Sequence, residues 1–489
     1  MPSGKLLWTP EPSFARKTNI ASYMKWLRAR GLDFEDYDSL WRWSVEDLEG
    51  FWGSIWKYFD VADVDYPVLP NRAMPGARWF EGSELNFAEK LFREKRTGTA
   101  IICRGERGGE KTYSWEDLRR KTSALAQTLK GMGVVSGDRV AALLPNSMEA
   151  IVAMLASASL GAVWSSCSPD FGAPSVVDRF NQIAPKVLLA TDGYYYGGKW
   201  YDRSEMVKDV AGAIGSIEKV ISAPGRSKGA GIEGTLDWAE ATRGKAALDF
   251  EQVPFEHPLW VLYSSGTTGL PKAIVHSHGG ILVELLKTLS LHNDLGPKDR
   301  FFWFTTTGWM MWNYLLGGLL HGATLVLYNG SPTYPSGDAL WRLAEETKTT
   351  FLGTSAAHLT SCARGGMDPG SNYDLSALRG IGSTGSPLPS ESFEWAYAHV
   401  KEDLWLASVS GGTDVCTGFV GGCPILPVYS GEIQCRCLGA KVEAFDESGT
   451  PVIGKVGELV VTEPMPSMPI YFWGDEDGRK YSSSYFEKY

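Results

Sequence analysis

Residues 263–272 hold the pattern in this chain whose residue types and spacing point most directly to chemistry. They read Tyr-Ser-Ser-Gly-Thr-Thr-Gly-Leu-Pro-Lys and follow the apolar run 259–262, which predicts the end of a buried strand. Glycines let the backbone approach a ligand closely, and hydroxyls beside loop amides can surround phosphate oxygens with O–H and N–H donors. The residues predicted to bind phosphate in this loop are Ser264, Ser265, Gly266, Thr267, Thr268, Gly269 and Lys272.

Two other interpretations of this loop fit the sequence less well. A flexible linker is not expected between a buried strand and the apolar residues 273–275, which resume at once. A Walker loop needs Gly-x-x-x-x-Gly-Lys-Ser/Thr, whereas here Pro271 precedes the lysine and Ala273 follows it. The sequence therefore predicts a phosphate-binding loop of another kind, with Lys272 as the positive charge at its rim.

The bulk composition excludes several classes of protein. A chain of 489 residues is too long for a single core, and 44% hydrophobic with 21% charged residues is ordinary for a globular protein. The net charge of −10, with no basic stripe, argues against a nucleic-acid partner. Seven scattered cysteines predict no disulfide framework. The N-terminus has no signal-peptide pattern and the longest apolar stretch, 150–164, is too short to cross a membrane, so we expect a cytoplasmic protein without a membrane partner.

Hydrophobic periodicity predicts an α/β protein. From about residue 98 short apolar runs alternate with helical patterns, which favours parallel sheets. Ser114 is predicted to cap one helix, with Asp117 at the capping-box position, and Ser44 is predicted to cap another, with Asp47 in that role. After Cys416 helices give way to short strands. The predicted divisions are a helical N-terminal extension (1–65), αβ subdomains (66–415) and a β-rich subdomain (416–489).

The loop at 263–272 resembles the phosphate loop of the adenylate-forming superfamily, which includes acyl-CoA synthetases, adenylation domains and luciferases. The resemblance covers essentially the whole chain. With the tryptophan-rich N-terminus and Thr-Thr-Gly-Trp-Met-Met-Trp-Asn at 306–313, it is nearest to the acetoacetyl-CoA synthetase group. It implies the large N-terminal domain of that α/β fold, with two αβ subdomains and a small β-barrel subdomain.

The resemblance also assigns nucleotide-binding residues. Thr413 would donate to the α-phosphate, and Asp414 would take the place of a glutamate that coordinates Mg²⁺, a cation for which carboxylates are suitable ligands. Thr413, Asp414 and Lys272 are thus the expected catalytic residues. By itself Gly-Gly-Thr-Asp is a common turn, and its order and distance after the phosphate loop favour the functional interpretation. The residues expected to line the adenine ring are Gly385, Ser386 and Pro387.

Two further groups of residues are carried over for the acid and for coenzyme A. Gly411 stands where acetyl-CoA synthetases have a tryptophan that closes the acyl pocket, which leaves room for a longer acid, although medium-chain synthetases also have glycine there. For any one of the large side chains, core packing remains an alternative. The expected acyl-pocket residues are Trp309, Met310, Met311, Thr384 and Gly411. The expected coenzyme A residues are Gly197, Gly198 and Lys199, with Tyr196 in the place of the usual arginine.

Members of the superfamily continue with a ribose-binding aspartate, a hinge and a C-terminal lid that carries a lysine needed for adenylation. Because the chain stops at Tyr489, we expect the C-terminal lid domain to be absent from it. The lid would otherwise rotate between the two steps of the reaction.

The resemblance implies ligation of acetoacetate to coenzyme A with ATP and Mg²⁺, through an acyl-adenylate. A medium- or branched-chain acyl-CoA synthetase is the nearest alternative, and an adenylation domain that loads a carrier protein is another. A non-catalytic nucleotide-binding protein is an alternative of a different class, although such a protein would be expected to lose Thr413 or Lys272, and this chain has both.

Overall fold

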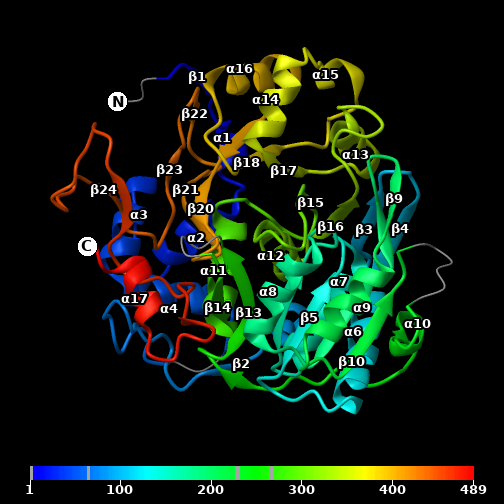
Figure 1. The fold of residues 1–489 in the computed structure, drawn as a ribbon. Helices are drawn as coiled ribbons and strands as arrows, with labels where there is room; N and C mark the ends of the chain where they lie inside the picture. The colour runs from blue at the N-terminus through cyan, green and yellow to red at the C-terminus, as the bar shows by residue number, and fades with distance from the viewer. Residues whose placement is uncertain (1–3, 63–65, 226–231, 265–268) are drawn as a thin grey trace.

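The computed structural model describes residues 4–62, 66–225, 232–264 and 269–489. Two large sheets dominate them, and Figure 1 shows one across the upper half of the molecule and the other across the lower half. Most neighbouring strands in both sheets run parallel, with helices between consecutive strands. The predicted α/β alternation and parallel pairing are therefore confirmed.

The lower sheet has eight strands among the described residues. Its strands from β11 to β13 run parallel, whereas β14 and β26 are antiparallel to their neighbours. In spatial order the strands are β11 (Leu236–Asp237), β10 (Lys219–Ala223), β7 (Val187–Thr191), β5 (Arg139–Leu143), β6 (Val163–Cys167), β13 (Pro258–Ser264), β14 (Lys272–Ser277) and β26 (Tyr471–Phe472).

The upper sheet has seven described strands, and all pairs are parallel except β3 with β4. Their carboxyl ends therefore open on one edge, where ligands of α/β proteins commonly bind. In spatial order the strands are β19 (Trp405–Ser408), β18 (Gly380–Thr384), β17 (Phe351–Ser355), β15 (Arg300–Trp303), β16 (Thr324–Asn329), β3 (Thr99–Gly105) and β4 (Glu110–Ser114).

The strands after residue 416 were expected to form one small β-barrel, and the described strands instead belong to four different sheets. A segment joins whichever sheet edge packing brings near it, and the sequence does not show that edge. The small sheets are β20 (Ser410–Gly412) with β21 (Thr417–Gly421) and β23 (Cys435–Arg436), β24 (Val442–Phe445) with β25 (Glu458–Val461), β1 (Leu6–Trp8) with β22 (Val428–Tyr429), β2 (Glu84–Leu85) with β12 (Val253–Pro254), and β8 (Gly193–Tyr196) with β9 (Lys199–Asp202).

Helix α11 (His278–Leu291) is central to the packing, because all of its residues are buried. It contacts the N-terminal helices α2 and α4, the sheet strand β14 and the hairpin strand β21. The other helices are α1 (Pro12–Ala15), α2 (Asn19–Arg28), α3 (Tyr37–Glu46), α4 (Leu48–Tyr58), α5 (Phe87–Arg93), α6 (Trp115–Gly131), α7 (Met148–Ser159), α8 (Ala173–Ile183), α9 (Ser204–Ala213), α10 (Trp238–Ala241), α12 (Met311–Leu316), the 3₁₀ helix η1 (Gly317–His321), α13 (Ala339–Thr347), α14 (Ala356–Arg364), α15 (Pro369–Asn372), α16 (Ser390–His399) and α17 (Arg479–Tyr485).

The charged pair Glu284–Lys287 lies inside α11 with both side chains fully buried. Lys287 Nζ is 2.7 Å from Glu284 Oε1 and donates to Leu438 O at 2.9 Å. The ammonium also lies over the ring of Trp52 in α4. The pair thus links the N-terminal helices and the 438 region to the central helix.

One predicted helix cap is confirmed and another is wrong. Ser114 and Asp117 form a capping box at the start of α6, as predicted. Ser44 does not cap a helix, because it lies inside α3, where its hydroxyl donates to Trp41 O and accepts from Gly439 N. Asp47 caps α4 instead, by accepting from Gly50 N.

Helix α17 is a further departure from the expectation of only strands after residue 416. In Figure 1 it is the red helix at the end of the chain, beside β14.

No helix among the described residues combines the length and apolar character required to span a bilayer.

Candidate active site

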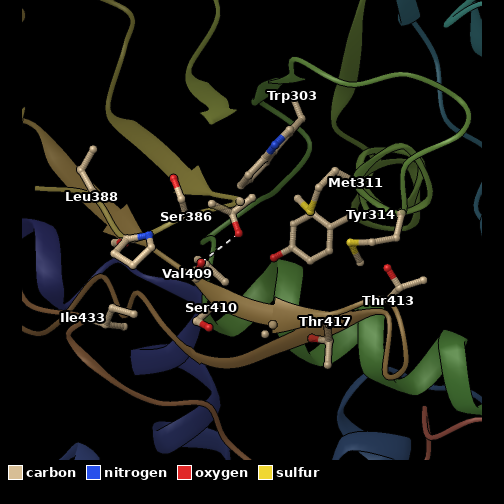
Figure 2. Close-up of a pocket in the computed structure, with 18 of the residues that line it drawn as sticks. Trp303, Met311, Tyr314, Ser386, Leu388, Val409, Ser410, Thr413, Thr417 and Ile433 are labelled. Carbon is tan, nitrogen blue, oxygen red and sulfur yellow. Dashed lines mark hydrogen bonds between the residues drawn. The ribbon is translucent and has the colours of Figure 1, made fainter. Parts of the chain in front are cut away.

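A cavity of 520 Å³ opens where three strands of the upper sheet end. Trp303, Thr384 and Ser408 are the last residues of β15, β18 and β19, and all three line it. The hairpin β20–β21 forms the opposite wall (Figure 2). The cavity therefore lies at the carboxyl-terminal edge of a mostly parallel sheet.

All five residues expected to form the acyl pocket line this cavity: Trp309, Met310, Met311, Thr384 and Gly411. The first three come from the turn before α12 and from its first residue, and the two methionines are buried. Thr384 Oγ1 donates to Val409 O at 2.9 Å, which is the dashed line in Figure 2. This bond fixes the threonine and joins the end of β18 to the hairpin.

The geometry at Gly411 adds a constraint that the sequence did not reveal. A Cβ on Gly411 would lie 2.1 Å from Thr417 O and 2.8 Å from Gly418 Cα, both atoms of the facing strand. A side chain at this position would therefore force β20 and β21 apart. Close backbone pairing, and not only space for the acid, requires glycine here.

The indole of Trp303 forms part of the cavity wall, and the sequence analysis did not predict this role. Trp303, Gly353 and Gly382 are register partners across three adjacent strands. A Cβ on Gly353 would lie 2.0 Å from Trp303 Cδ2, and one on Gly382 would lie 2.7 Å from Cη2. The indole thus packs directly against the backbone of Gly353 and Gly382, where no side chain lies in between. Its position near the end of the apolar run 301–304 was the available signal.

Tyr314 is a second lining residue that sequence reasoning missed. It lies one turn into α12 beyond the predicted methionines, and its ring centroid is 5.7 Å from that of Trp303. Its hydroxyl donates to Asn293 Oδ1 at 2.6 Å, and burial raises its pKa, so the hydroxyl stays protonated. The helical spacing from Met310 to Tyr314 was the signal that could have identified it.

The residues expected to lie against adenine, Gly385, Ser386 and Pro387, also line the cavity. They follow directly after β18, and Gly385 has a φ of +91°, which favours glycine. Figure 2 shows Ser386 across the cavity from Met311 and Tyr314. The expected adenine and acyl walls are therefore opposite sides of one space.

Thr413 lines the cavity, whereas Asp414 and Lys272 are outside its lining. Thr413 and Asp414 lie in the turn between β20 and β21. His276 Nε2 donates to Asp414 O at 2.8 Å, and the hydroxyl of Tyr485 donates to Asp414 Oδ1. Burial lowers the pKa of His276 to about 4, so its ring is neutral at pH 7.

The predicted phosphate loop is only partly within the described residues. Ser264, the last residue of β13, pairs in register with Lys272, the first of β14. Gly269 has a φ of +103°. The four remaining predicted positions, Ser265, Gly266, Thr267 and Thr268, lie outside the described residues.

The residues expected to bind coenzyme A, Gly197, Gly198 and Lys199, lie in the hairpin β8–β9 and are not part of the cavity lining. The carboxylate of Glu106 accepts from the backbone N–H groups of both glycines at 2.8 Å. It also accepts from Ser331 N at 2.9 Å. These two amides are therefore engaged within the protein, whereas the side chain of Lys199 is exposed and carries a positive charge.

The possible metal ligands near the cavity suit an ion that is bound partly by the protein and partly by a substrate. Among the described residues, no group of three or more His, Cys, Asp or Glu side chains could hold a metal ion. Mg²⁺, however, is commonly held by one or two carboxylates together with substrate phosphates and water. The partly buried Asp414 beside the cavity fits that arrangement.

Comparisons with known proteins match this chain along its length. Residues 89–472 match the AMP-binding enzyme family, and residues 37–91 match the acetyl-coenzyme A synthetase N-terminus. The chain is 44% identical to the acetoacetyl-coenzyme A synthetase of Rhizobium meliloti (strain 1021), covering 100% of this chain and 76% of that protein. It is 41% identical to the acetoacetyl-CoA synthetase of Gallus gallus, covering 99% and 75%. The solved acetoacetyl-CoA synthetase from Streptomyces lividans matches with a TM-score of 0.95 and 49% identity, covering 99% of this chain and 76% of that one.

These matches correct the prediction that the C-terminal lid domain is absent. The prediction interpreted the end of the chain at Tyr489 as the loss of a domain. The enzymes that match along the whole chain are longer than the matched part, and the chain spans about three quarters of them. The position of Tyr489 is therefore no evidence for a lost domain, and the prediction is wrong.

The family match covers most of the chain, and the similarity to two relatives and one solved structure extends over nearly all of it. The fold class, apart from the lid and the barrel, agrees with that match. The chain belongs to the AMP-binding enzyme family and, within it, to the acetoacetyl-CoA synthetases.

Proposed function

We propose that the protein ligates acetoacetate to coenzyme A at the expense of ATP, through an acetoacetyl-adenylate, and releases AMP and pyrophosphate. One observation carries the proposal furthest. The residues assigned to the acid and those assigned to adenine line the same cavity of 520 Å³, and Thr413 lines it too. An acid and a nucleotide bound there would have the carboxylate and the α-phosphate side by side.

In the first step a carboxylate oxygen of the acid attacks the α-phosphorus, and the bond from that phosphorus to the pyrophosphate oxygen breaks. In the second step the thiolate of coenzyme A attacks the carbonyl carbon, and AMP leaves with the electron pair. Neither step needs a covalent bond to the protein, so positioning and charge stabilisation supply the catalysis. Thr413 would donate to the α-phosphate, and Lys272 would place a positive charge near the phosphates.

Asp414 is the residue that would hold Mg²⁺. When bound, the ion neutralises charge on the phosphate oxygens. The contribution of the protein is the fixed carboxylate, because His276 holds the backbone of Asp414 and Tyr485 holds one carboxylate oxygen.

The comparisons support acetoacetate as the acid, because relatives that are 44% and 41% identical to this chain are acetoacetyl-CoA synthetases. Gly411 in the cavity wall supports an acid longer than acetate, because no side chain fills the space at that position.

For coenzyme A we propose the surface of the β8–β9 hairpin, with Lys199 as the charge available to a phosphate. The support is structural rigidity. Glu106 ties the turn to the loop after β16, so the hairpin presents Lys199 in a defined place.

The test is pyrophosphate release by the whole protein with Mg·ATP, coenzyme A and one of four acids: acetoacetate, acetate, butyrate or octanoate. We expect acetoacetate to give the highest kcat/KM. A preference for butyrate or octanoate would replace the proposal with a medium-chain synthetase. Tight ATP binding with no pyrophosphate release for any acid would indicate a non-catalytic nucleotide-binding protein.

A further inference from the structure

Tyr485 contacts both charged residues assigned to the phosphates, although it is 71 residues from one of them in sequence. Its hydroxyl donates to Asp414 Oδ1, and its ring lies 5.3 Å from Lys272 Nζ. Tyr485 is the last residue of α17, the red helix of Figure 1. Neither the motifs nor the family comparison assigns it a role.

The bond from Tyr485 orients the carboxylate of Asp414. Oδ1 is held on the α17 side, whereas Oδ2 lies on the side of Gly412, where a Cβ would be 3.4 Å from it. Gly412 lines the cavity. One oxygen is thus anchored, and the other is directed toward the space where the nucleotide is proposed to bind.

The backbone of Asp414 is held as well. His276 in β14 donates to Asp414 O at 2.8 Å. The residue is therefore fixed at both ends, by a strand of the lower sheet and by α17. This matters because aspartate is one methylene shorter than glutamate, so its oxygen must be placed by its surroundings rather than by a flexible reach.

Lys272 lies over two aromatic rings, that of Tyr485 and that of Phe472, which is 5.6 Å away. Phe472 is in β26, and its ring packs edge-on against Tyr485. A cation over aromatic faces is attracted to them without being neutralised. The ammonium is therefore held in place while its charge remains available to a phosphate.

The two oxygens of the Asp414 carboxylate can have different partners. Oδ1 accepts from the hydroxyl of Tyr485, and Oδ2 is left to bind a cation.

We propose that Tyr485 is a positioning residue, which directs Asp414 Oδ2 toward the metal ion bound with ATP and holds Lys272 beside the phosphates. This inference rests on the proposed function of the cavity. It assigns to α17, outside every recognised motif, the task of assembling the charged half of the site.

The test uses three variants of the whole protein. Tyr485→Phe removes the hydroxyl and keeps the ring over Lys272, whereas Tyr485→Leu removes both. Tyr481→Phe is the matched control, because Tyr481 is in the same helix and its hydroxyl donates to Pro469 O at 3.0 Å rather than to Asp414. Each phenylalanine variant loses one hydroxyl bond, so similar melting temperatures for the two would show that α17 is intact.

Binding of Mn²⁺ to the ATP complex is measured by electron paramagnetic resonance without acid, so that no turnover occurs. We expect Tyr485→Phe to weaken Mn²⁺ binding about three- to tenfold, the size for loss of a hydrogen bond to a charged group that is partly exposed. Tyr481→Phe should match the wild type. In ATP–pyrophosphate exchange at saturating Mg²⁺, Tyr485→Leu should raise the KM for ATP, and Tyr485→Phe should not.

Unchanged Mn²⁺ affinity in Tyr485→Phe would overturn the inference. Tighter binding would overturn it too, because the hydroxyl would then compete with the metal for the carboxylate. These results are distinct from failure of the proposed function, in which the wild type would catalyse no exchange with any acid. The Mn²⁺ titration depends on ATP binding alone and remains readable in that case.

Discussion

Replacement of Gly353 by alanine should push the indole of Trp303 off the sheet and into the cavity. The backbone at Gly353 is compatible with alanine, because its φ is not in the left-handed region. The added Cβ would lie 2.0 Å from Trp303 Cδ2 and 2.1 Å from Cε3. These atoms belong to a rigid ring in a buried strand, so no flexible side-chain end can give way.

The geometry sets the size of the effect. Ordinary contact begins near 3.4 Å, so the indole must move by about 1.4 Å, the difference between 3.4 and 2.0 Å. Overpacking of this kind typically costs about 1–3 kcal/mol of unfolding free energy. A displacement of about 1 Å in a substrate-positioning group can reduce kcat/KM by about 100-fold. We therefore expect kcat/KM for acetoacetate to fall about 10- to 100-fold.

The assay combines urea unfolding with ATP–pyrophosphate exchange at varied acetoacetate concentration. Gly212→Ala is the matched control, because Gly212 is an exposed residue of α9 with nothing within 4 Å of its Cβ position. That change should preserve activity and raise stability by up to about 1 kcal/mol. If Gly353→Ala behaves like Gly212→Ala in both measurements, the assignment of Trp303 to the cavity wall is refuted.

Three further outcomes follow from the structure. Lys272→Met should lower the ATP–pyrophosphate exchange rate about 100-fold, because it removes the positive charge beside the phosphates, and should lower the unfolding free energy by only about 0.5–1 kcal/mol, because it removes the contacts of the ammonium with the rings of Phe472 and Tyr485; equal rates would exclude Lys272 from catalysis. Glu284→Gln should cost about 3–5 kcal/mol in urea unfolding, because it leaves the buried ammonium of Lys287 without its counter-charge, and adding Lys287→Met should recover part of that loss. Burial lowers the pKa of His276 to about 4 and that of His278 to about 3. The unfolded chain then binds more protons below pH 6.5, so unfolding free energy should be full above that pH and fall by about 1.4 kcal/mol per histidine for each pH unit down to about 4; a flat profile from pH 7 to pH 5 would contradict this.

Part of the candidate site could be predicted because the resemblance to the family assigned its residues. Thr384 ends one parallel strand, Gly385 follows it, and Met310 comes after another strand of the same sheet. Parallel strands end on a common edge, so the assembly of these residues around one cavity agrees with the α/β pattern. The capping box of Ser114 and Asp117 could also be predicted, because its two partners are only three residues apart in the sequence.

Predictions failed where a distant partner determined the local structure. Ser44 had the sequence context of a helix cap, yet its hydroxyl accepts from Gly439 N, 395 residues away, and α3 continues past it. The sequence likewise did not show that the carboxylate of Glu106 binds the backbone amides of Gly197 and Gly198. No window of sequence contains these partners together.

The sequence alone determined the family, the α/β alternation and the residues that follow the strand ends, because these depend on short motifs and on periodicity. Only the tertiary structure determined the wall of Trp303 over Gly353 and the contact of Tyr485 with Asp414 and Lys272. Both arise from side chains that meet across separate elements. Such contacts depend on how whole sheets and helices pack, and the spacing of residues along the chain does not encode that packing locally.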